Sequence, residues 1–366
     1  MQTSTIKFSQ IEDRIDAEYY KPEYLEVKEN LDKSKGVKFL GDIVNVIMNG
    51  VEFRTYSLSG KPYLRVSDIK EIFMDLSDVK YIPENIEFSK NIELLDGDVL
   101  TSRSGTLGIS AIAPKAGSII SSHLIRISPK KEINSYYLVV FLNSKYGRLQ
   151  ILQKNNGAVV PEINQPSLKS LKIPIPSQSF QQKIEEMVKE AQKKRKLADE
   201  KYKEAEEILN KELGLEDLNL STQKTFETKF SEVEDRLDPE YYQSKYKKII
   251  SKLKNQKSAL LGEIVKIRKG IEVGHEAYTN EGKPFIRVQD FDEKELAVSG
   301  STNYIRFYLY EELKKNHKPN AREIIFSKDG TVGRAFVIKE DNNKFIVSGG
   351  ILILTPRDID NYYLAF

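Results

Sequence analysis

Cysteine is absent from the 366-residue chain, and histidine occurs only three times. Without cysteine the chain can form no disulfide bond, no thiolate metal site and no thiol nucleophile, a composition that suits a reducing cytoplasm. His123, His275 and His317 lie far apart in the sequence, without the spacing of metal ligands. We therefore expect no zinc site.

An excess of charge and long apolar runs are also missing. Basic side chains number 57 and acidic ones 54, so the net charge of +3 gives no sign of nucleic-acid binding. No apolar run approaches the roughly 20 residues of a membrane-spanning helix, and the N-terminus lacks the basic and apolar segments of a secretory signal. With 39% hydrophobic and 30% charged residues, the composition predicts a globular cytoplasmic protein without membrane association.

Sequence signatures of catalysis are lacking as well. The chain has no Pro-Pro pair, which the Asn/Asp-Pro-Pro-aromatic motif of adenine methyltransferases requires, and no glycine-rich cofactor loop that opens a helix. Asp68–Glu71 and Asp292–Lys294 contain the acidic and basic residue types of a metal-dependent nuclease. Their spacing does not fit such a site, and we interpret them as surface charge. We expect a chain that is not an enzyme and binds no cofactor.

An internal repeat is the strongest feature that is present. Residues 7–20 align with residues 229–242, and ten of the 14 positions are identical. Further blocks follow in the same order and nearly the same register: 40–44 with 261–265, 60–66 with 282–288, 98–108 with 323–333, and 134–138 with 360–364. The two copies are therefore expected to share one fold.

The shared blocks predict short strands and tight turns. Residues 64–66 and 98–100 are aliphatic and bounded by glycine or proline, as strands are, and residues 103–108 form a glycine-punctuated turn. Between the blocks the copies diverge, as in residues 51–57 against 271–278. Variable loops on a common scaffold indicate two modules that bind different targets in the same way.

One long helix is predicted between the copies, from Ser179 to Leu213. Pro174 and Pro176 end the preceding strand, Ser179 and Gln182 fit a capping box, and Gly214 follows the end. About 35 residues at 1.5 Å each give a length of about 52 Å.

A heptad pattern gives this helix an apolar seam, interrupted only by Arg195. The seam, which we expect to dock a partner helix or another subunit, consists of Ile184, Val188, Ala191, Ala198, Tyr202, Ala205 and Leu209. Since the charges of the helix cancel, a solvated coiled-coil helix is favoured over a basic helix that contacts DNA.

The second copy ends at Phe366, near the position of Phe141 in the first copy. By this measure about 70 residues are missing from the second copy, including a second helix, so we expect a fragment. The sequence thus predicts an α+β protein with two homologous domains, each a mixed β-sheet with flanking helices. The expected domains are residues 1–176 and 215–366, the latter incomplete, joined by a helix within 177–214.

This arrangement resembles the specificity subunits of type I restriction–modification enzymes. Four features that span essentially the whole chain carry the resemblance: Arg-x-Asp-x-x-Tyr-Tyr at 14–20 and 236–242, Gly-Lys-Pro-aromatic-aliphatic-Arg-Val at 60–66 and 282–288, Ser-Gly-Thr-Leu-Gly at 104–108, and Ile-Pro-Ile-Pro at 173–176 before the helix. Each motif alone is weak, but their repeated order around a heptad helix is specific. In this family two target-recognition domains are each followed by a long helix, and the two helices pack antiparallel; the missing second helix departs from that pattern.

The resemblance implies a mechanism without catalysis in this chain. Each domain would read one half of a split, asymmetric site in double-stranded DNA, and the helix would set the spacing and dock modification subunits. Those subunits would carry S-adenosylmethionine and methylate adenine, while restriction subunits, which combine motor and nuclease, would be recruited with their ATP and Mg²⁺.

Side chains that hydrogen-bond to base edges or phosphates are the candidate contacts. They lie in the loops near Gly50 and Gly270, in the turns around Gly105 and Gly330, and in the Gly-Lys-Pro strands. The candidates are Asn49, Arg54, Tyr56, Arg65, Arg103, Ser104, Thr106, Lys269, His275, Tyr278, Arg287, Lys328, Thr331 and Arg334. Each could also be an ordinary exposed polar residue.

Residues that recur in both copies favour structural roles over base reading, because two different half-sites need different readers. Arg65 and Arg287 recur in a shared strand, which favours a structural or phosphate contact. The Arg-x-Asp pairs at 14–16 and 236–238 favour a salt bridge or helix cap, and the double tyrosines at 19–20 and 241–242 favour aromatic packing over base stacking.

Three other functions stay open at this stage. The chain could be a nuclease or methyltransferase in its own right, which a cleavage or cofactor-binding assay would reveal. It could be a two-domain protein-binding scaffold without DNA contact, which salt-dependent DNA binding would exclude. It could also be the specificity region of a single-chain restriction–modification enzyme.

Overall fold

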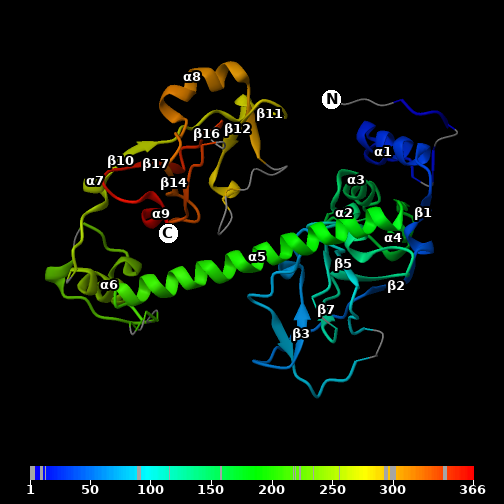
Figure 1. The fold of residues 1–366 in the computed structure, drawn as a ribbon, viewed down its shortest axis with the longest axis horizontal. Coiled ribbons are helices and arrows are strands. Elements are labelled where there is room, and N and C mark those ends of the chain that lie inside the picture. Colours follow the sequence, from blue (N-terminus) through cyan, green and yellow to red (C-terminus); the bar gives the residue numbers. More distant parts are fainter. Residues whose placement is uncertain are drawn as a thin grey trace. The chain divides into compact units, whose positions relative to one another are not determined.

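The computed structural model describes residues 5–8, 11–12, 14–88, 92–114, 116–156, 159–216, 218, 220–221, 224–233, 235–254, 256–291, 296, 302–340 and 344–366. The chain divides into two compact units, Met1–Ala205 and Glu206–Phe366 (Figure 1). Both contain sheets with helices packed around them, as the α+β prediction required. No helix in the described part of the chain is both long and apolar enough to cross a membrane.

The first unit contains two main sheets. A four-stranded antiparallel sheet has the order β2-β8-β5-β6, formed by Val44–Asn49, Leu124–Pro129, Val99–Ser102 and Ser110–Ile112. A three-stranded sheet has the order β4-β3-β7, formed by Lys80–Ile82, Lys61–Leu64 and Ile119–Ile120, in which β3 and β7 run parallel. A third, two-stranded sheet pairs β1 (Val37–Phe39) with β9 (Lys172–Pro174).

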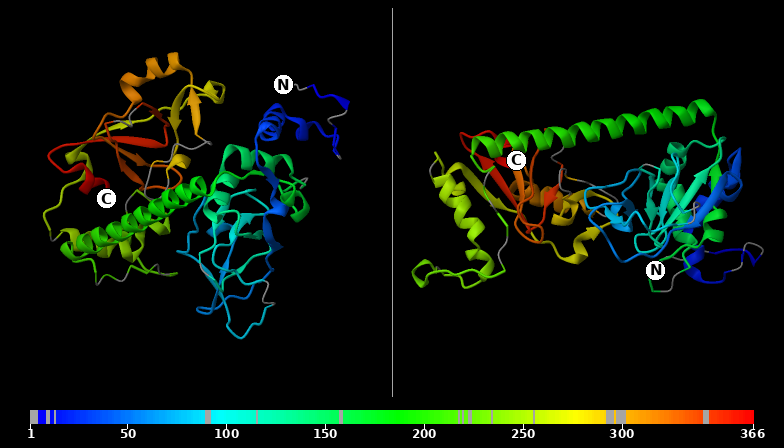
Figure 2. Two further views of the ribbon diagram at one scale, coloured as in Figure 1. Left: turned by 45° about the vertical axis from the view of Figure 1, so that its right-hand side comes forward. Right: turned by 90° about the horizontal axis from the view of Figure 1, so that it is seen from below.

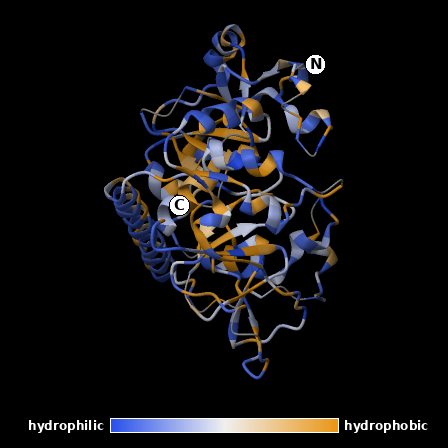
Figure 3. Cartoon of the chain, turned by 90° about the vertical axis from the view of Figure 1, so that its right-hand side faces the viewer, coloured by the Kyte–Doolittle hydropathy of each residue, from blue (hydrophilic) through white to orange (hydrophobic). Residues whose placement is uncertain are grey.

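Short helices cover the first unit and close its core. They are α1 (Pro22–Lys33), α2 (Ser135–Asn143), α3 (Lys145–Gln153) and α4 (Gln165–Lys169), with 3₁₀ turns η2 (Ala17–Tyr20), η3 (Leu40–Asp42) and η4 (Val66–Asp68). The largest buried cluster joins residues of α1, β2, β8, α2 and α3, including Leu31, Ile47, Ile127, Leu138 and Ile151. Figure 3 shows hydrophobic residues along many of the strands.

The second unit repeats the two main sheets of the first, with one added strand, β11, in the second of them. One sheet has the order β10-β17-β14-β15, formed by Val265–Lys269, Ile351–Pro356, Ile324–Ser327 and Ala335–Val337. The other has the order β11-β13-β12-β16, formed by Tyr278–Thr279, Asn303–Ile305, Lys283–Ile286 and Ile346–Val347, with β12 and β16 parallel. Its helices are α6 (Ser244–Lys254), α7 (Leu261–Ile264), α8 (Phe307–His317) and α9 (Asn361–Ala365), and its 3₁₀ turns are η5 (Phe230–Glu232), η6 (Pro239–Tyr242), η7 (His275–Ala277) and η8 (Val288–Asp290). The repeat read from the sequence is therefore a repeat of fold.

The predicted long helix is α5, Gln178–Glu212, a single uninterrupted helix of 35 residues (Figure 2). It begins one residue before the predicted start, Ser179. The prediction that Ser179 caps the helix was wrong. Phe180 N–H donates to the hydroxyl of Ser177 at 3.4 Å and to its carbonyl at 3.0 Å, so Ser177 takes the capping position.

The predicted seam of α5 is packed at its ends and exposed in its middle. Val188 is 7% exposed and Ile184 packs against the core of the first unit, whereas Ala205 and Leu209 are half-buried. Between them Ala191 and Ala198 are exposed, and Tyr202 is 44% exposed. Arg195, which interrupts the seam, lies over the ring of Phe73, with its guanidinium carbon 5.9 Å from the ring centroid. Phe73 belongs to none of the strands.

The recurring Arg-x-Asp and tyrosine pairs are structural, as predicted. Asp16 accepts a hydrogen bond from Tyr19 N–H at 3.1 Å and pairs with Arg14 at 2.8 Å, and Asp238 and Arg236 repeat both contacts in the second unit. Tyr20 and Tyr242 each donate from the hydroxyl to the carbonyl of that arginine at 2.6 Å. Within each pair the two tyrosine rings meet edge to face. These contacts fold the segment ahead of the first helix onto each unit.

Candidate nucleic-acid interface

A glycine directly after β2 in the first unit, and after β10 in the second, allows two loops to meet. A Cβ atom on Gly50 would lie 2.1 Å from the carbonyl oxygen of Ile120, and one on Gly270 would lie 2.1 Å from that of Ser348. Only glycine fits at either position. In both units the next residue donates its N–H to the neighbouring strand, from Val51 to Ile120 at 2.9 Å and from Ile271 to Val347 at 3.0 Å.

A serine stabilises the predicted turn around Gly105 in the first unit and the one around Gly330 in the second. The Ser102 hydroxyl donates to the Thr106 carbonyl at 2.5 Å and accepts from Ile109 N–H at 2.9 Å. Ser327 does the same with Thr331 at 2.6 Å and Arg334 at 2.9 Å. The residue after the serine then donates its backbone N–H across to the third loop, Arg103 to His123 at 2.8 Å and Lys328 to Gly350 at 3.0 Å. Each unit thus brings three loops together.

In the first unit the three loops are joined by polar side chains. Ser122 Oγ donates to Glu52 at 2.8 Å, and Arg54 pairs with the same carboxylate at 3.0 Å. The hydrogen bond from Ser122, reinforced by Arg54, lowers the pKa of Glu52 below its ordinary value. Ser104 Oγ lies 2.7 Å from His123 Nδ1, so these two side chains form a second bridge between loops.

Arg103 is already engaged within the first unit. Its guanidinium forms an ion pair with Glu162 and donates to the Ser122 carbonyl at 3.2 Å. The remaining candidates of this cluster are open to solvent: Arg54 is 87% exposed, Tyr56 is 44% exposed and Thr106 is exposed, whereas Asn49 is half-buried. The buried amide oxygen of Asn49 has no hydrogen-bond partner among the described residues.

The equivalent cluster of the second unit carries different chemistry. Lys328 pairs with its neighbour Asp329 at 2.8 Å, and Arg334 donates to the carbonyl of Phe291. Lys269, His275 and Thr331 are exposed, whereas Tyr278 is half-buried and packs on Phe285 with ring centroids 5.7 Å apart. The scaffold of the two clusters is the same, and the side chains on it differ.

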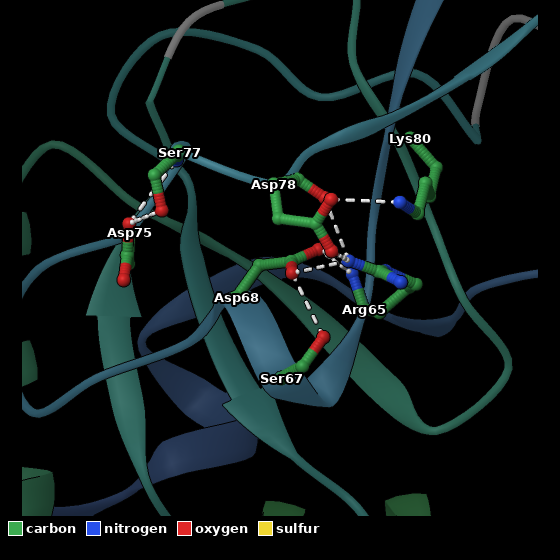
Figure 4. A network of polar contacts seen from close by, with 7 residues as sticks. All are labelled: Arg65, Ser67, Asp68, Asp75, Ser77, Asp78 and Lys80. Carbon is green, nitrogen blue, oxygen red and sulfur yellow. Dashed lines mark hydrogen bonds and ion pairs between the residues drawn. The ribbon is translucent and has the colours of Figure 1, made fainter. Parts of the chain in front are cut away.

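Arg65 and Arg287 directly follow β3 and β12 and contact groups of their own units. The shared strands end at Leu64 and Ile286, so the prediction that placed both arginines within a strand was wrong by one residue. Arg65 Nη2 donates to Asp68 at 2.9 Å and to the Asp78 carbonyl at 2.8 Å, and Asp78 also pairs with Lys80 at 2.7 Å (Figure 4). The hydrogen bond that Arg65 donates to the Asp68 carboxylate raises the pKa of Arg65 above its ordinary value.

The second unit repeats only part of this network. The buried carboxylate of Asp290 accepts the backbone N–H of Arg287 at 2.8 Å, as that of Asp68 accepts the Arg65 N–H at 2.8 Å. The Arg287 guanidinium lies 5.7 Å from the ring of Tyr278. Both arginines therefore make contacts within their own unit, as their recurrence in the two copies favoured.

The acidic segment Asp68–Glu71 makes contacts within the fold. Asp68 is 4% exposed, so its interpretation as surface charge was wrong: it caps η4 from within the fold, and Glu71 pairs with Arg148 at 3.3 Å. Asp292, Glu293 and Lys294 lie outside the described residues. Within the described ranges no group of three histidine or acidic side chains could hold a metal ion.

Sequence reasoning missed Glu52, Glu162 and His123 as members of the first cluster. The carboxylates bind the candidate arginines Arg54 and Arg103, and His123 binds the candidate Ser104. The available signal for His123 was the register itself, which places it opposite Gly350, so that this position differs between the copies as a base-reading position would.

The fold and its loops define a class of protein in which a duplicated scaffold presents two differing recognition surfaces. Residues 32–207 match the model of the family described as "Type I restriction modification DNA specificity domain". This match assigns residues 32–207 to a family of DNA specificity domains of type I restriction–modification systems.

Solved structures of specificity subunits resemble the chain at low identity. The S subunit of a type I restriction–modification system from M. genitalium is 15% identical, with 90% of this chain and 75% of that chain covered and a TM-score of 0.38. The HsdS subunit from Thermoanaerobacter tengcongensis is 18% identical, with coverage of 90% and 78% and a TM-score of 0.32. A chain from a structure of the type I R-M system is 17% identical, with the same coverage and a TM-score of 0.33. The curated proteins include no significant match.

Proposed function

We propose that the two units read the two halves of a bipartite, asymmetric site in double-stranded DNA. The observation that carries this proposal is the matched loop cluster: identical backbone contacts hold the same three loops in each unit, while the side chains on them differ. A shared scaffold fixes how each unit meets DNA, and different side chains select different bases.

The proposed contacts fall into two groups. The exposed loop residues, namely Arg54, Tyr56, Thr106, Lys269, His275 and Thr331, are proposed to meet bases or phosphates directly, and the half-buried Ser104 lies beside them, bonded to His123. Arg65, Arg103, Arg287 and Arg334 bind groups of their own unit, so we assign them to holding the loops in place. Lys328 pairs with Asp329, and Asn49 and Tyr278 lie half-buried beside the loops.

The connector is proposed to set the distance between half-sites and to dock partner subunits. Residues 1–176 and 215–366 would act as recognition domains, and residues 177–214 as the connector. At about 3.4 Å per base pair, a helix of about 52 Å spans at most about 15 base pairs. The exposed middle of its seam would meet a partner helix or a modification subunit in the cytoplasm.

The chemistry is proposed to lie on the partners. Modification subunits would supply S-adenosylmethionine and methylate adenine, and restriction subunits would supply ATP-dependent and Mg²⁺-dependent steps. In this arrangement the chain positions these subunits on DNA and binds no cofactor itself.

The test is to assemble the chain with its modification subunits and measure binding to duplex DNA over a range of salt concentrations, then map the methylated adenines. We expect affinity that falls steeply as salt rises, because phosphate contacts release counterions, and methylation at one split sequence. A complex that assembles without detectable affinity for DNA would favour a protein-binding scaffold instead.

A further inference from the structure

The Ser104–His123 pair is a side-chain bridge of the first cluster that has no counterpart among the described residues of the second. Ser104 corresponds to Asp329 and His123 to Gly350 in the register of the repeat. The backbone hydrogen bond beside the pair is retained, from Arg103 to His123 in one unit and from Lys328 to Gly350 in the other. The difference is therefore confined to the two side chains.

The serine fixes which atoms the histidine presents. Nδ1 of His123 lies 2.7 Å from Ser104 Oγ, and Ser104 has no other side-chain hydrogen bond within the described part of the chain. We assign the serine as donor to Nδ1, which places the ring proton of the neutral histidine on Nε2. A protonated ring would also carry a proton there. The exposed Nε2–H is then a hydrogen-bond donor that no described residue accepts.

The second unit presents an acceptor at the same place. The Asp329 carboxylate is exposed beside Lys328, and a Cβ atom on Gly350 would lie 3.5 Å from Asp329 Oδ2. The glycine therefore leaves free the space next to the carboxylate. One unit offers a donor and the other an acceptor on the same backbone frame.

Resting on the proposed function, we infer that the Ser104–His123 pair reads a guanine in the first half-site, with Nε2–H of His123 donating to N7 or O6. Guanine presents two acceptors, N7 and O6, in the major groove, whereas adenine presents one acceptor beside an amino donor, thymine presents one acceptor, and cytosine presents an amino donor. A lone donor is therefore best matched by guanine. Asp329 has the opposite preference and accepts from such an amino group. Ser104 is a positioning residue that holds the ring.

The test uses the full chain assembled with its modification subunits and duplexes randomised at each half-site. We expect His123→Ala to lose preference for guanine at one base pair of one half-site by about 2- to 12-fold, the usual worth of one hydrogen bond. The other half-site should keep its preference. Ser104→Ala should weaken the same position by less, and Ser34→Ala, which removes an exposed serine on the C-terminal side of α1, should change neither half-site.

A double variant makes the inference sharper. Ser104→Asp with His123→Gly gives the first unit the side chains of the second, and we expect the preference at that base pair to move from guanine to a base with an amino donor. A uniform loss of affinity with a weaker salt dependence would identify a phosphate contact and overturn the inference, as would an unchanged base preference. Absence of any half-site preference in the unaltered complex would overturn the proposed function itself.

Discussion

Two glycines decide whether the recognition loops can form at all. At Gly50 and Gly270 a methyl group would lie about 2 Å from a backbone oxygen, and a backbone atom cannot move aside as a flexible side chain can. We expect Gly50→Ala and Gly270→Ala each to lower the free energy of unfolding by about 1–3 kcal/mol or more. Thermal unfolding would measure the effect.

The matched control is Gly262→Ala, where a Cβ atom meets nothing within 4 Å. Its helix α7 should be unharmed or slightly stabilised, since alanine favours helix over glycine. Equal effects at Gly50 and Gly262 would contradict the close approach.

A buried ion pair occupies the same place in both units but is built from different strands. Asp98, 1% exposed, binds Arg126 of β8 at 2.6 Å, whereas its counterpart Glu323 binds Arg268 of β10 at 2.5 Å. The register pairs Met48 with Arg126 in the first unit and Arg268 with Ile353 in the second. The arginine of the ion pair therefore lies on β8 in the first unit and on β10, the counterpart of β2, in the second.

We expect Arg126→Met to destabilise the first unit by about 3–5 kcal/mol, because it leaves Asp98 buried without its counter-charge. Adding Met48→Arg and Asp98→Glu copies the second unit and should restore part of the loss. Chemical denaturation of the unaltered chain, the single variant and the triple variant would measure the free energy of unfolding of each. No recovery in the triple variant would show that the two arrangements are not interchangeable.

At the scale of elements, α5 has two kinds of surface along one seam. Val188 is packed on the first unit, whereas Ala198, ten residues on, is exposed. Val188→Ala should lower the free energy of unfolding by about 1–3 kcal/mol, from the apolar area lost. Ala198→Ser should change it by less than about 0.5 kcal/mol, as exposed substitutions do. A similar cost at both sites in the isolated chain would mean that the middle of the seam is covered.

The elements that local pattern governs could be predicted from the sequence, and those that distant contacts govern could not. The heptad repeat located α5 to within one residue at each end, and the Arg-x-Asp motif predicted its cap and ion pair. The burial of Asp68 could not be foreseen, since it depends on a fold that brings residues far apart together. The Ser104–His123 contact joins loops 19 residues apart for the same reason.

The helix α8 shows the limit of the repeat as a guide. It lies between β13 and β14, whereas the described residues between β4 and β5 form no helix. Alignment of the shared blocks cannot assign structure to a segment that only one copy contains.

At the scale of the whole molecule, the length of α5 should set the distance between half-sites. Repeating residues 192–198 after Ala198 lengthens the helix by about 10.5 Å and keeps the seam on one face, because the insertion is one heptad. We expect the spacer of the methylated site to grow by about three base pairs while both half-site sequences are kept.

An insertion of five residues at the same point is the control. It turns the following seam by about 140°, so it should impair assembly with the modification subunits rather than yield a new spacing. If the heptad variant is active and its methylated site keeps the original spacer, the length of α5 does not set the distance between half-sites.

The relocated ion pair also records how the two copies diverged. A single substitution cannot carry the arginine from one strand to its neighbour: removing it first leaves a buried carboxylate without a counter-charge, and adding the second first crowds two guanidinium groups around one acid. Divergence of the two copies from one ancestor would therefore pass through one of these two costly sequences or through a neutral residue at the acid. Relatives that carry arginine on both strands, or a neutral residue at the acid, would identify the route taken.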